Sequence, residues 1–269
     1  MDAAADYPGS VSLFASTADF YRHHRSGVPA EIAVFLSENA PGGAPRRLLD
    51  VGTGPGFAIE ALEPFFDEAI GIDLDAELLA AARDGVQTRK PVRFVQAAAE
   101  TFALPPGWTA HLVTVCRAFH WFDRSRFLAH VVGHMAPGAA LAILGDQSVW
   151  AGGDLWKDRV RMVVQEVLGE ERRAGSGTYR PSDRRFTDDM SDAGFTFLTH
   201  RSVPVERVLT VDSVIGLLHS MSFASPAVLG ERMDEFDRRV REELEPLVDD
   251  AGVLIDHNEF YVYTGARPD

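Results

Sequence analysis

A glycine-rich turn and a later aspartate carry the strongest chemical signal in this chain. Residues 48–57 read Leu-Leu-Asp-Val-Gly-Thr-Gly-Pro-Gly-Phe, which is typical of a buried strand, a tight turn and the start of a helix. Asp73 follows the last of these glycines by 17 residues and closes a second apolar segment. Glycine lets the backbone approach a ligand, and an acid at the next strand end can accept hydrogen bonds from ribose hydroxyls. The pattern predicts a nucleoside-binding site.

The spacing of the glycines argues against a dinucleotide. The dinucleotide fingerprint is G-x-G-x-x-G, whereas Gly52, Gly54 and Gly56 follow one another at every second residue. Asp50 lies at the end of the strand before the turn, where a carboxylate would repel a pyrophosphate and attract an ammonium group. We therefore expect a zwitterionic sulfonium nucleoside, S-adenosylmethionine, as the cofactor. A dehydrogenase is a distant alternative.

Strands and helices alternate around these residues. Strands are expected at 47–51, 69–73, 92–96, 110–116, 139–144, 195–207 and 260–264. Helices fit near 56–66, 75–84 and 123–134. Such alternation predicts an α/β fold with a mostly parallel sheet that helices cover on both faces.

Several segments are too long to be simple connections, and we expect them to form a lid over the carboxyl ends of the strands. Residues 10–40, 156–168 and 228–247 show helical spacing, and 169–185 is a polar loop. The expected division is a helical lid segment at 1–40, a cofactor-binding α/β core at 41–146, a lid insertion at 147–194, and C-terminal strands at 195–269 with a helical insertion at 209–250.

Length, composition and net charge exclude several classes of protein. A length of 269 residues fits one embellished α/β domain, and the single cysteine, Cys116, excludes a disulfide framework. We expect a soluble cytoplasmic protein, because neither a signal peptide nor an apolar stretch of about 18 residues is apparent. The net charge of -14 disfavours a nucleic-acid partner. It is consistent with solubility by self-repulsion or with attraction of a cationic small substrate.

Five segments together resemble class I S-adenosylmethionine-dependent methyltransferases, in the type-11 branch that includes trans-aconitate methyltransferase-like enzymes. They are an entry segment with Phe14, Tyr21 and Arg25, the glycine turn, Gly71-Ile72-Asp73, Ala99-Glu100 with Leu104-Pro105, and Ala118-Phe119-His120-Trp121-Phe122-Asp123. The resemblance covers residues 14–145 well. It implies a Rossmann-like class I methyltransferase fold with a seven-stranded sheet and a helical lid.

The resemblance also implies roles for individual residues. The three turn glycines would wrap the methionine part of the cofactor near Asp50, Asp73 would bind the ribose, and Leu74 would pack on the adenine. The other implied cofactor contacts are Tyr21, Arg25, Ala99, Glu100, Ala118 and Phe119. Two alternatives stay open: Glu100 as a solvated loop acid, and Tyr21 with Arg25 as residues that only hold the N-terminal helix in place.

Methyl transfer from a sulfonium is an in-line displacement, for which the protein mainly supplies alignment and desolvation. We therefore expect no triad and no metal. His120 is the candidate catalytic base because its imidazole is neutral at physiological pH, with a packing role as the alternative. Aromatic rings at Phe119 and Trp121 could attract a cation or simply form core and wall. The candidate substrate contacts are Trp121, Tyr179 and His219.

For a catalytic protein we expect a small-molecule acceptor, with no membrane partner, and the oligomeric state is left open. Residues 231–250 hold nine acids and four arginines, which favours a cationic acceptor, as in N-methylation of an amino sugar or aminoglycoside-like metabolite. The resemblance suggests carboxylate O-methylation instead, for which Arg180, Arg184 and Arg185 could serve. A protein that binds the cofactor without catalysis is the third possibility.

Overall fold

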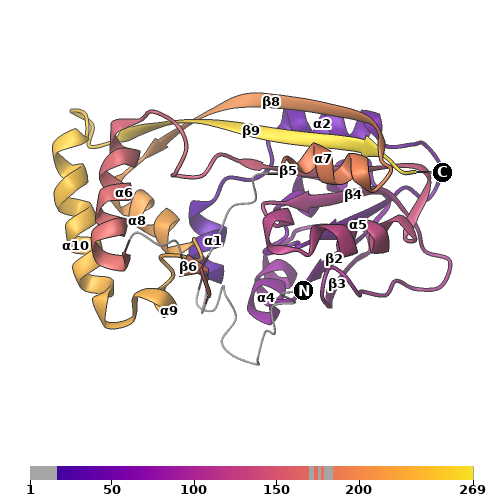
Figure 1. Cartoon of the computed structure of the whole chain (residues 1–269), viewed down its shortest axis with the longest axis horizontal. Helices are drawn as coiled ribbons and strands as arrows, with labels where there is room; N and C mark the ends of the chain where they lie inside the picture. The colour runs from indigo at the N-terminus through magenta and orange to yellow at the C-terminus, as the bar shows by residue number, and fades with distance from the viewer. Residues whose placement is uncertain (1–16, 170–172, 175–176, 179–183, 269) are drawn as a thin grey trace.

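A seven-stranded sheet forms the centre of the described structure, a computed structural model that covers residues 17–169, 173–174, 177–178 and 184–268 (Figure 1). The strand order is β3-β2-β1-β4-β5-β9-β8. The strands are β1 (Arg47–Val51), β2 (Glu68–Asp73), β3 (Val92–Gln96), β4 (Ala110–Cys116), β5 (Met135–Asp146), β8 (Thr196–Leu209) and β9 (Leu254–Ala266). The first five are parallel, and β9 runs antiparallel to both β5 and β8. This confirms the predicted Rossmann-like class I methyltransferase fold.

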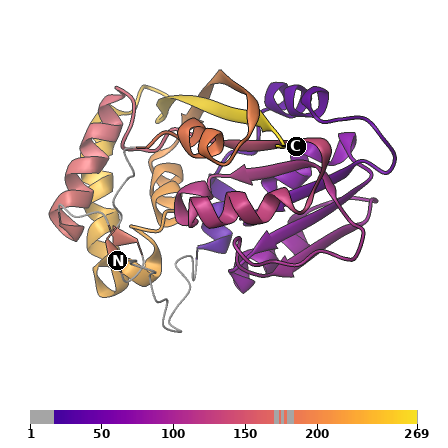
Figure 2. The same ribbon diagram turned by 45° about the vertical axis from the view of Figure 1, so that its right-hand side comes forward.

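Helices cover both faces of the sheet, as Figure 2 shows. They are α1 (Ala18–His24), α2 (Ala30–Asn39), α3 (Phe57–Leu62), α4 (Ala76–Gly85), α5 (Arg124–Val132), α6 (Leu155–Leu168), α7 (Phe186–Asp192), α8 (Val211–His219), α9 (Pro226–Leu229) and α10 (Met233–Leu244). The two-residue strands β6 (Arg173–Ala174) and β7 (Gly177–Thr178) pair with each other. Among the described residues, no helix is both long and apolar enough to cross a lipid bilayer.

Successive residues of one strand enter different cores because side chains alternate between the faces of a sheet. Leu48 packs with α2 and α3 on one face, and Leu49 packs with α5 and α7 on the other. Burial on both faces explains why β1 and β4 read as continuous apolar runs. Because β1 lies between β2 and β4, the strand order reverses beside β1. Open α/β sheets bind ligands at such a point, beyond the carboxyl ends of the strands.

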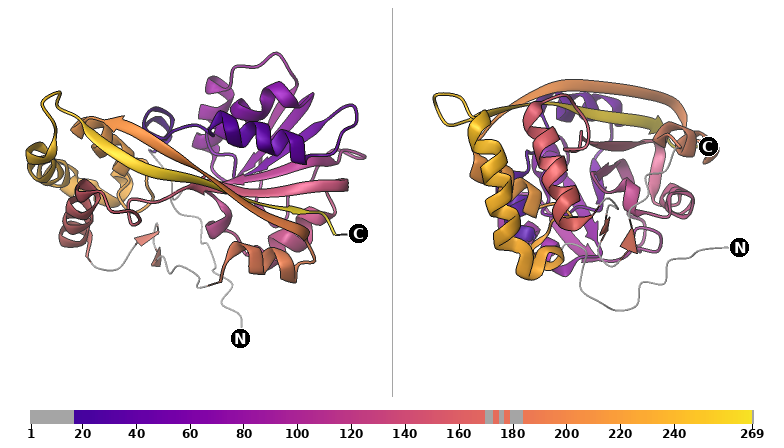
Figure 3. Two further views of the ribbon diagram at one scale, coloured as in Figure 1. Left: turned by 90° about the horizontal axis from the view of Figure 1, so that it is seen from above. Right: turned by 60° about the vertical axis from the view of Figure 1, so that its left-hand side comes forward.

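A third core lies outside the sheet. It joins α6, α8, α9 and α10, which we call the helical cap, to the far ends of β8 and β9 through Leu209 and Leu254. These two strands are long and run from the sheet to the cap (Figure 3). Helix α1 lies between the two parts and contacts α8 on one side and α4 on the other (Figure 1).

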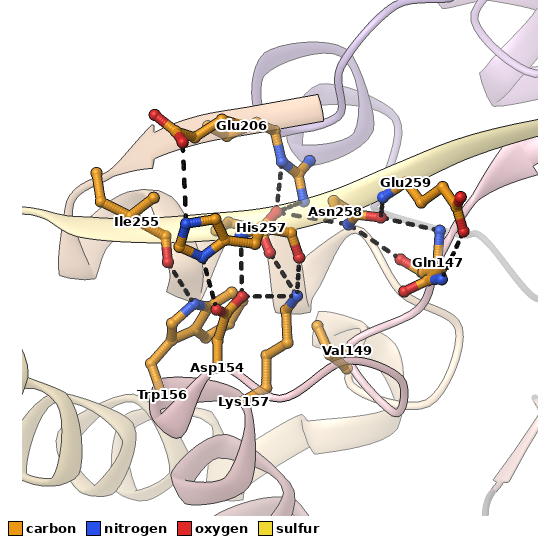
Figure 4. Close-up of polar contacts among 12 residues, drawn as sticks. Gln147, Val149, Asp154, Trp156, Lys157, Glu206, Ile255, His257, Asn258 and Glu259 are labelled. Atoms are coloured by element: carbon orange, nitrogen blue, oxygen red, sulfur yellow. Dashed lines mark hydrogen bonds and ion pairs between the residues drawn. The ribbon is translucent and has the colours of Figure 1, made fainter. Parts of the chain in front are cut away.

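Buried charges fasten the cap to the strands. The Lys157 ammonium lies 2.7 Å from Asp256 Oδ1 and 2.9 Å from Asp154 Oδ2, and it donates a hydrogen bond to the His257 carbonyl (Figure 4). Arg207 donates from Nε to Asp256 Oδ2 over 2.7 Å. Buried charges need partners of opposite sign. This network therefore holds the start of α6 against β8 and β9.

The structure differs from the sequence expectation in three elements. The expected helical stretch over 10–40 is interrupted between α1 and α2, where Pro29 requires an extended residue before it. The strands expected at 139–144 and 260–264 extend to the bounds of β5 and β9, because β9 also pairs with β8 far beyond the sheet. Met190 of α7 packs in the sheet core, although 147–194 was expected to be an insertion. The domain boundaries themselves remain a prediction.

Candidate active site

The glycine turn after β1 and the carboxylate at the end of β2 are directly hydrogen-bonded. The backbone N–H of Gly54 donates to Asp73 Oδ2 over 2.8 Å, and that of Asp75 donates to Asp73 Oδ1 over 2.9 Å. The Gly52 N–H donates to the Ile72 carbonyl over 2.8 Å. The structure therefore brings together the two features that the sequence singled out.

The three turn glycines have different neighbours. A Cβ at Gly52 would lie 2.3 Å from the Ala118 Cβ, and a Cβ at Gly56 would lie 2.4 Å from Val86 Cγ2. Packing therefore requires glycine at both positions. Gly54 has φ +52, and no atom of the described residues lies within 4 Å of the position its Cβ would take. Open space beside a backbone turn is what a bound ligand needs.

Leu74 adds an apolar surface to this space. Its side chain directly follows Asp73 and is 64% exposed. Single exposed apolar residues are common on protein surfaces. This one follows the carboxylate that holds the glycine turn, where an apolar side chain can pack on a planar base.

Asp50 is a buried carboxylate near the hydroxyls of Thr114 and Thr53. Its side chain is inaccessible to solvent, and the Thr114 hydroxyl donates to Oδ1 over 2.6 Å. Oδ2 has no hydrogen-bond partner among the described residues. Burial raises the pKa of Asp50 to about 6, although the Thr114 hydrogen bond acts in the opposite direction. A cation bound at the adjacent glycine turn would stabilise the ionised form electrostatically, so Asp50 fits a role as the nearby counter-charge of the ammonium group of S-adenosylmethionine.

The loop after β3 is held at both ends. The Ala97 N–H donates to the Asp73 carbonyl over 3.0 Å, and Glu100 Oε1 accepts a hydrogen bond from the Asp123 N–H over 2.9 Å. Ala99 is buried in the sheet core. Glu100 thus links this loop to the start of α5, and both predicted residues lie on a segment that is fastened to Asp73.

The residues after β4 divide between core and site. Phe119 is 1% exposed and packs against Phe127 and Phe186, so its ring belongs to the core. His120 is partly buried, and its ring centroid lies 4.8 Å from that of Trp121. Burial, assisted by the charges of Arg124 and Arg25, lowers the pKa of His120 to about 4. Its imidazole is therefore neutral at physiological pH, and it is a weak base.

Helix α1 lies on the glycine turn. The Tyr21 ring stacks on Phe57, which follows the turn, at a centroid distance of 6.0 Å. Arg22 donates to the Pro55 carbonyl over 3.4 Å and forms an ion pair with Glu60. Sequence patterns singled out Tyr21 but not Arg22. No local pattern distinguishes this arginine, because its partners come from a distant part of the chain.

Arg117 and Asp146 are a second pair that sequence patterns did not single out. Arg117 follows β4 in a left-handed conformation, with φ +57, and its guanidinium lies 2.5 Å from Asp146 at the end of β5. It also donates to the Ser26 carbonyl over 3.0 Å. Burial alone would raise the pKa of Asp146, but the charge of Arg117 lowers it to about 2. A strained conformation that buried contacts maintain is a common feature of functional sites.

Other candidates lie elsewhere. His219 is buried in the cap core, where Nε2 lies 2.9 Å from Asp237 Oδ1 and Nδ1 lies 3.1 Å from the Ala224 carbonyl. Arg184 and Arg185 form ion pairs with acids of α7. The candidates outside the described residues are Phe14, Tyr179 and Arg180. In the described part of the chain, no group of three or more His, Cys, Asp or Glu side chains is arranged to hold a metal.

Comparison with known proteins agrees with this geometry. Residues 49–143 match a family model described as methyltransferase domain. The uncharacterized methyltransferase YcgJ of Bacillus subtilis is 30% identical over 115 residues, which are 42% of this chain and 45% of YcgJ. Trans-aconitate 2-methyltransferase of Rhodopseudomonas palustris is 32% identical over 103 residues, 37% of this chain and 38% of that enzyme. The crystal structure of YcgJ superimposes with a TM-score of 0.54 at 16% identity, covering 90% of this chain and 100% of YcgJ.

The fold, the glycine turn and the matched domain define an α/β domain of the S-adenosylmethionine-binding kind. Residues 49–143 match a methyltransferase domain, in agreement with the class I S-adenosylmethionine-dependent methyltransferases of the type-11 branch that the sequence resembles. The fold that this resemblance predicted is confirmed. The matched segments span less than half the length of these two curated relatives.

Proposed function

We propose that this protein transfers the methyl group of S-adenosylmethionine to a small-molecule acceptor. The observation that carries the proposal is the hydrogen bond from Gly54 to Asp73, with open space beside the glycine and the exposed Leu74 next to the carboxylate. These three features lie together. They give a ligand access to the backbone, an acceptor for its ribose hydroxyls and an apolar surface for its base.

Each residue of this set has one proposed task. Asp50 is the nearby counter-charge of the ammonium group, the backbone around Gly54 lies along the amino-acid part, Asp73 binds the ribose and Leu74 packs on the base. Ala99 and Glu100 border the base, and Tyr21 covers the turn from α1. When bound, the cofactor supplies a methyl group activated on a sulfonium sulfur. The chain orients the two reactants and excludes water, which can remove several kcal/mol from the barrier.

The properties of His120 favour a carboxylate acceptor over an amine. An alkylammonium has a pKa of about 10, so proton transfer to a base of pKa about 4 costs roughly 8 kcal/mol. A carboxylate is already ionised at neutral pH and needs no base. The relatives named trans-aconitate 2-methyltransferase agree with this choice. His120 then has an orienting role beside the acceptor, together with Trp121.

An amine acceptor remains the second candidate because the whole chain carries a charge of -14. Several acids that contribute to this charge are already paired with arginines of α10, namely Glu242 with Arg238, Glu166 with Arg239 and Asp212 with Arg241. Helix α10 lies at the far side of the cap from the sheet (Figure 1). These acids therefore give little support to a cationic acceptor at the strand ends.

The test is binding followed by turnover. Calorimetry of the full chain should show binding of S-adenosylhomocysteine, and incubation with S-adenosylmethionine and a panel of carboxylic acids and amines should yield a methylated product. Mass spectrometry identifies the acceptor by a gain of one CH₂. Binding without turnover on any acceptor would indicate the non-catalytic alternative. Stabilisation by a nicotinamide dinucleotide, but not by S-adenosylhomocysteine, would refute the proposal.

A further inference from the structure

Arg25 differs from the other arginines near the strand ends because it has no carboxylate partner. Four neighbouring arginines each form an ion pair: Arg22 with Glu60, Arg117 with Asp146, Arg124 with Asp189 and Arg207 with Asp256. In the part of the chain that the structure describes, no carboxylate oxygen lies within 4.0 Å of the Arg25 guanidinium. Its charge is therefore without a direct counter-charge there.

The contacts of Arg25 leave most of its N–H groups available. Its Nε donates to the Ser220 hydroxyl at the end of α8 over 2.9 Å, and the guanidinium lies 5.2 Å from the centroid of the Tyr21 ring. Among the described residues, no acceptor is hydrogen-bonded to its two terminal nitrogens. A guanidinium in this state presents a planar pair of donors, which matches the two oxygens of a carboxylate.

Among the described residues, the charged groups around Arg25 pair with one another and leave no carboxylate for Arg25 itself. Arg117 and Arg207 both act electrostatically on Arg25, and Asp146 is the carboxylate that acts on it most strongly. Asp146 is already bound to Arg117, and the partner of Arg207, Asp256, is shared with Lys157. Burial lowers the pKa of Arg25, which shows that its charge is partly removed from water. A partly desolvated cation is stabilised by an incoming anion.

The position of Arg25 is on the acceptor side of the site. On α1, Tyr21 and Arg22 contact the glycine turn, where the cofactor is proposed to bind. Arg25 instead contacts α8 and lies close enough to His120 to lower its pKa. The resemblance to the family implied a cofactor contact for Arg25, and these contacts point to the acceptor.

We propose that Arg25 binds a carboxylate group of the acceptor and thereby selects an anionic substrate. This inference rests on the proposed function and names the substrate class of the same site. The other source of a carboxylate is the amino-acid part of the cofactor itself, and the experiment separates the two.

The experiment uses the full chain saturated with S-adenosylhomocysteine and titrated with propane-1,2,3-tricarboxylate in a calorimeter. Arg25→Gln should weaken tricarboxylate binding by about tenfold or more, while the affinity for S-adenosylhomocysteine changes less than about twofold. Arg25→Lys keeps the charge but loses the paired donors. Its affinity for the tricarboxylate should therefore lie between those of the wild-type chain and Arg25→Gln. Arg93→Gln, which removes the same charge from the exposed side of β3, should leave both affinities unchanged.

Two outcomes overturn the inference. If Arg25→Gln weakens S-adenosylhomocysteine binding tenfold and leaves tricarboxylate binding intact, Arg25 binds the carboxylate of the cofactor. If the saturated wild-type chain binds the uncharged tricarboxamide as well as the tricarboxylate, or binds neither, the site does not select an anion. Failure of the wild-type chain to bind S-adenosylhomocysteine is a different result, because it refutes the proposed function. If Arg25→Gln is unfolded, the Arg25→Lys comparison decides.

Discussion

At the residue scale, the candidate site depends on one buried carboxylate and one unhindered glycine. Asp50 has its carboxylate in a region that water does not reach, and Gly54 has a left-handed backbone next to open space. Both features cost stability in the free chain. A substitution at Asp50 or at Gly54 should therefore change stability and ligand binding in ways that can be measured separately.

Asp50→Asn should stabilise the free protein at neutral pH and weaken cofactor binding. The folded pKa of about 6 lies above an unfolded value of about 3.9, so the native state binds the proton more tightly. Stability therefore falls as pH rises from about 4 to 6 and stays low above that, by up to about 3 kcal/mol. Asparagine keeps the acceptor for Thr114 and removes the charge. Urea denaturation at pH 5 and pH 8 measures the difference.

The same carboxylate should make cofactor binding depend on pH. The ammonium group prefers the ionised form, so the affinity of the wild-type chain for S-adenosylhomocysteine should rise as pH increases through about 6. Asp50→Asn should abolish this rise. Equal affinities of the two proteins at pH 8 would show that Asp50 is not the counter-charge of the ammonium group.

Gly54→Ala should impair binding more than folding. An L-residue at φ +52 costs about 1–2 kcal/mol, and its methyl group would occupy the open space beside the turn. Gly138→Ala is the matched control, because Gly138 has φ +71, lies outside the site and has no atom of the described residues within 4 Å of its Cβ position. Both variants should lose similar stability in a thermal melt. Only Gly54→Ala should lose affinity for S-adenosylhomocysteine, and an equal loss in both would contradict the assignment.

At the scale of the elements, the pair of Arg117 and Asp146 connects β4, β5 and the segment after α1. Both side chains are 8% exposed, and the Ser26 carbonyl is the third partner. Arg117→Met would leave the Asp146 charge buried without a partner, which costs about 3–5 kcal/mol. The double variant Arg117→Met with Asp146→Leu should recover most of this loss. Urea denaturation of the wild type, the two single variants and the double variant gives the coupling free energy, and additive losses would contradict the prediction.

At the scale of the whole molecule, the local and overall charges oppose each other. The net charge of -14 repels an anionic acceptor at long range, whereas the arginines near the strand ends attract it at short range. Salt screens exposed, distant charges more than partly buried ones. The association rate of propane-1,2,3-tricarboxylate should therefore rise as salt increases from about 20 to 200 mM. Stopped-flow tryptophan fluorescence measures it, and a steep fall would contradict the prediction.

The elements that sequence patterns predicted well depend on neighbouring residues. The bounds of β1, β3 and β4 agree with the expected 47–51, 92–96 and 110–116. The apolar runs of β1 and β4 identify strands buried on both faces, and the glycines after β1 identify a turn that needs positive φ. The prediction of a nucleoside-binding site rests on the same local signals, because Asp73 needs only the parallel pairing of β1 and β2 to reach Gly54.

The charge around the acceptor side was decided by the tertiary structure. Arg117 and Ser26 are 91 residues apart in the chain, and Arg25 and Ser220 are 195 apart. No periodicity links such residues, and the sequence alone favoured an acidic environment for a cationic acceptor. Folding pairs Glu242 and Asp212 with arginines of the outer helix α10 and brings other arginines to the strand ends. Local backbone geometry is determined by adjacent residues. An electrostatic environment depends instead on which side chains, distant in the sequence, are buried together.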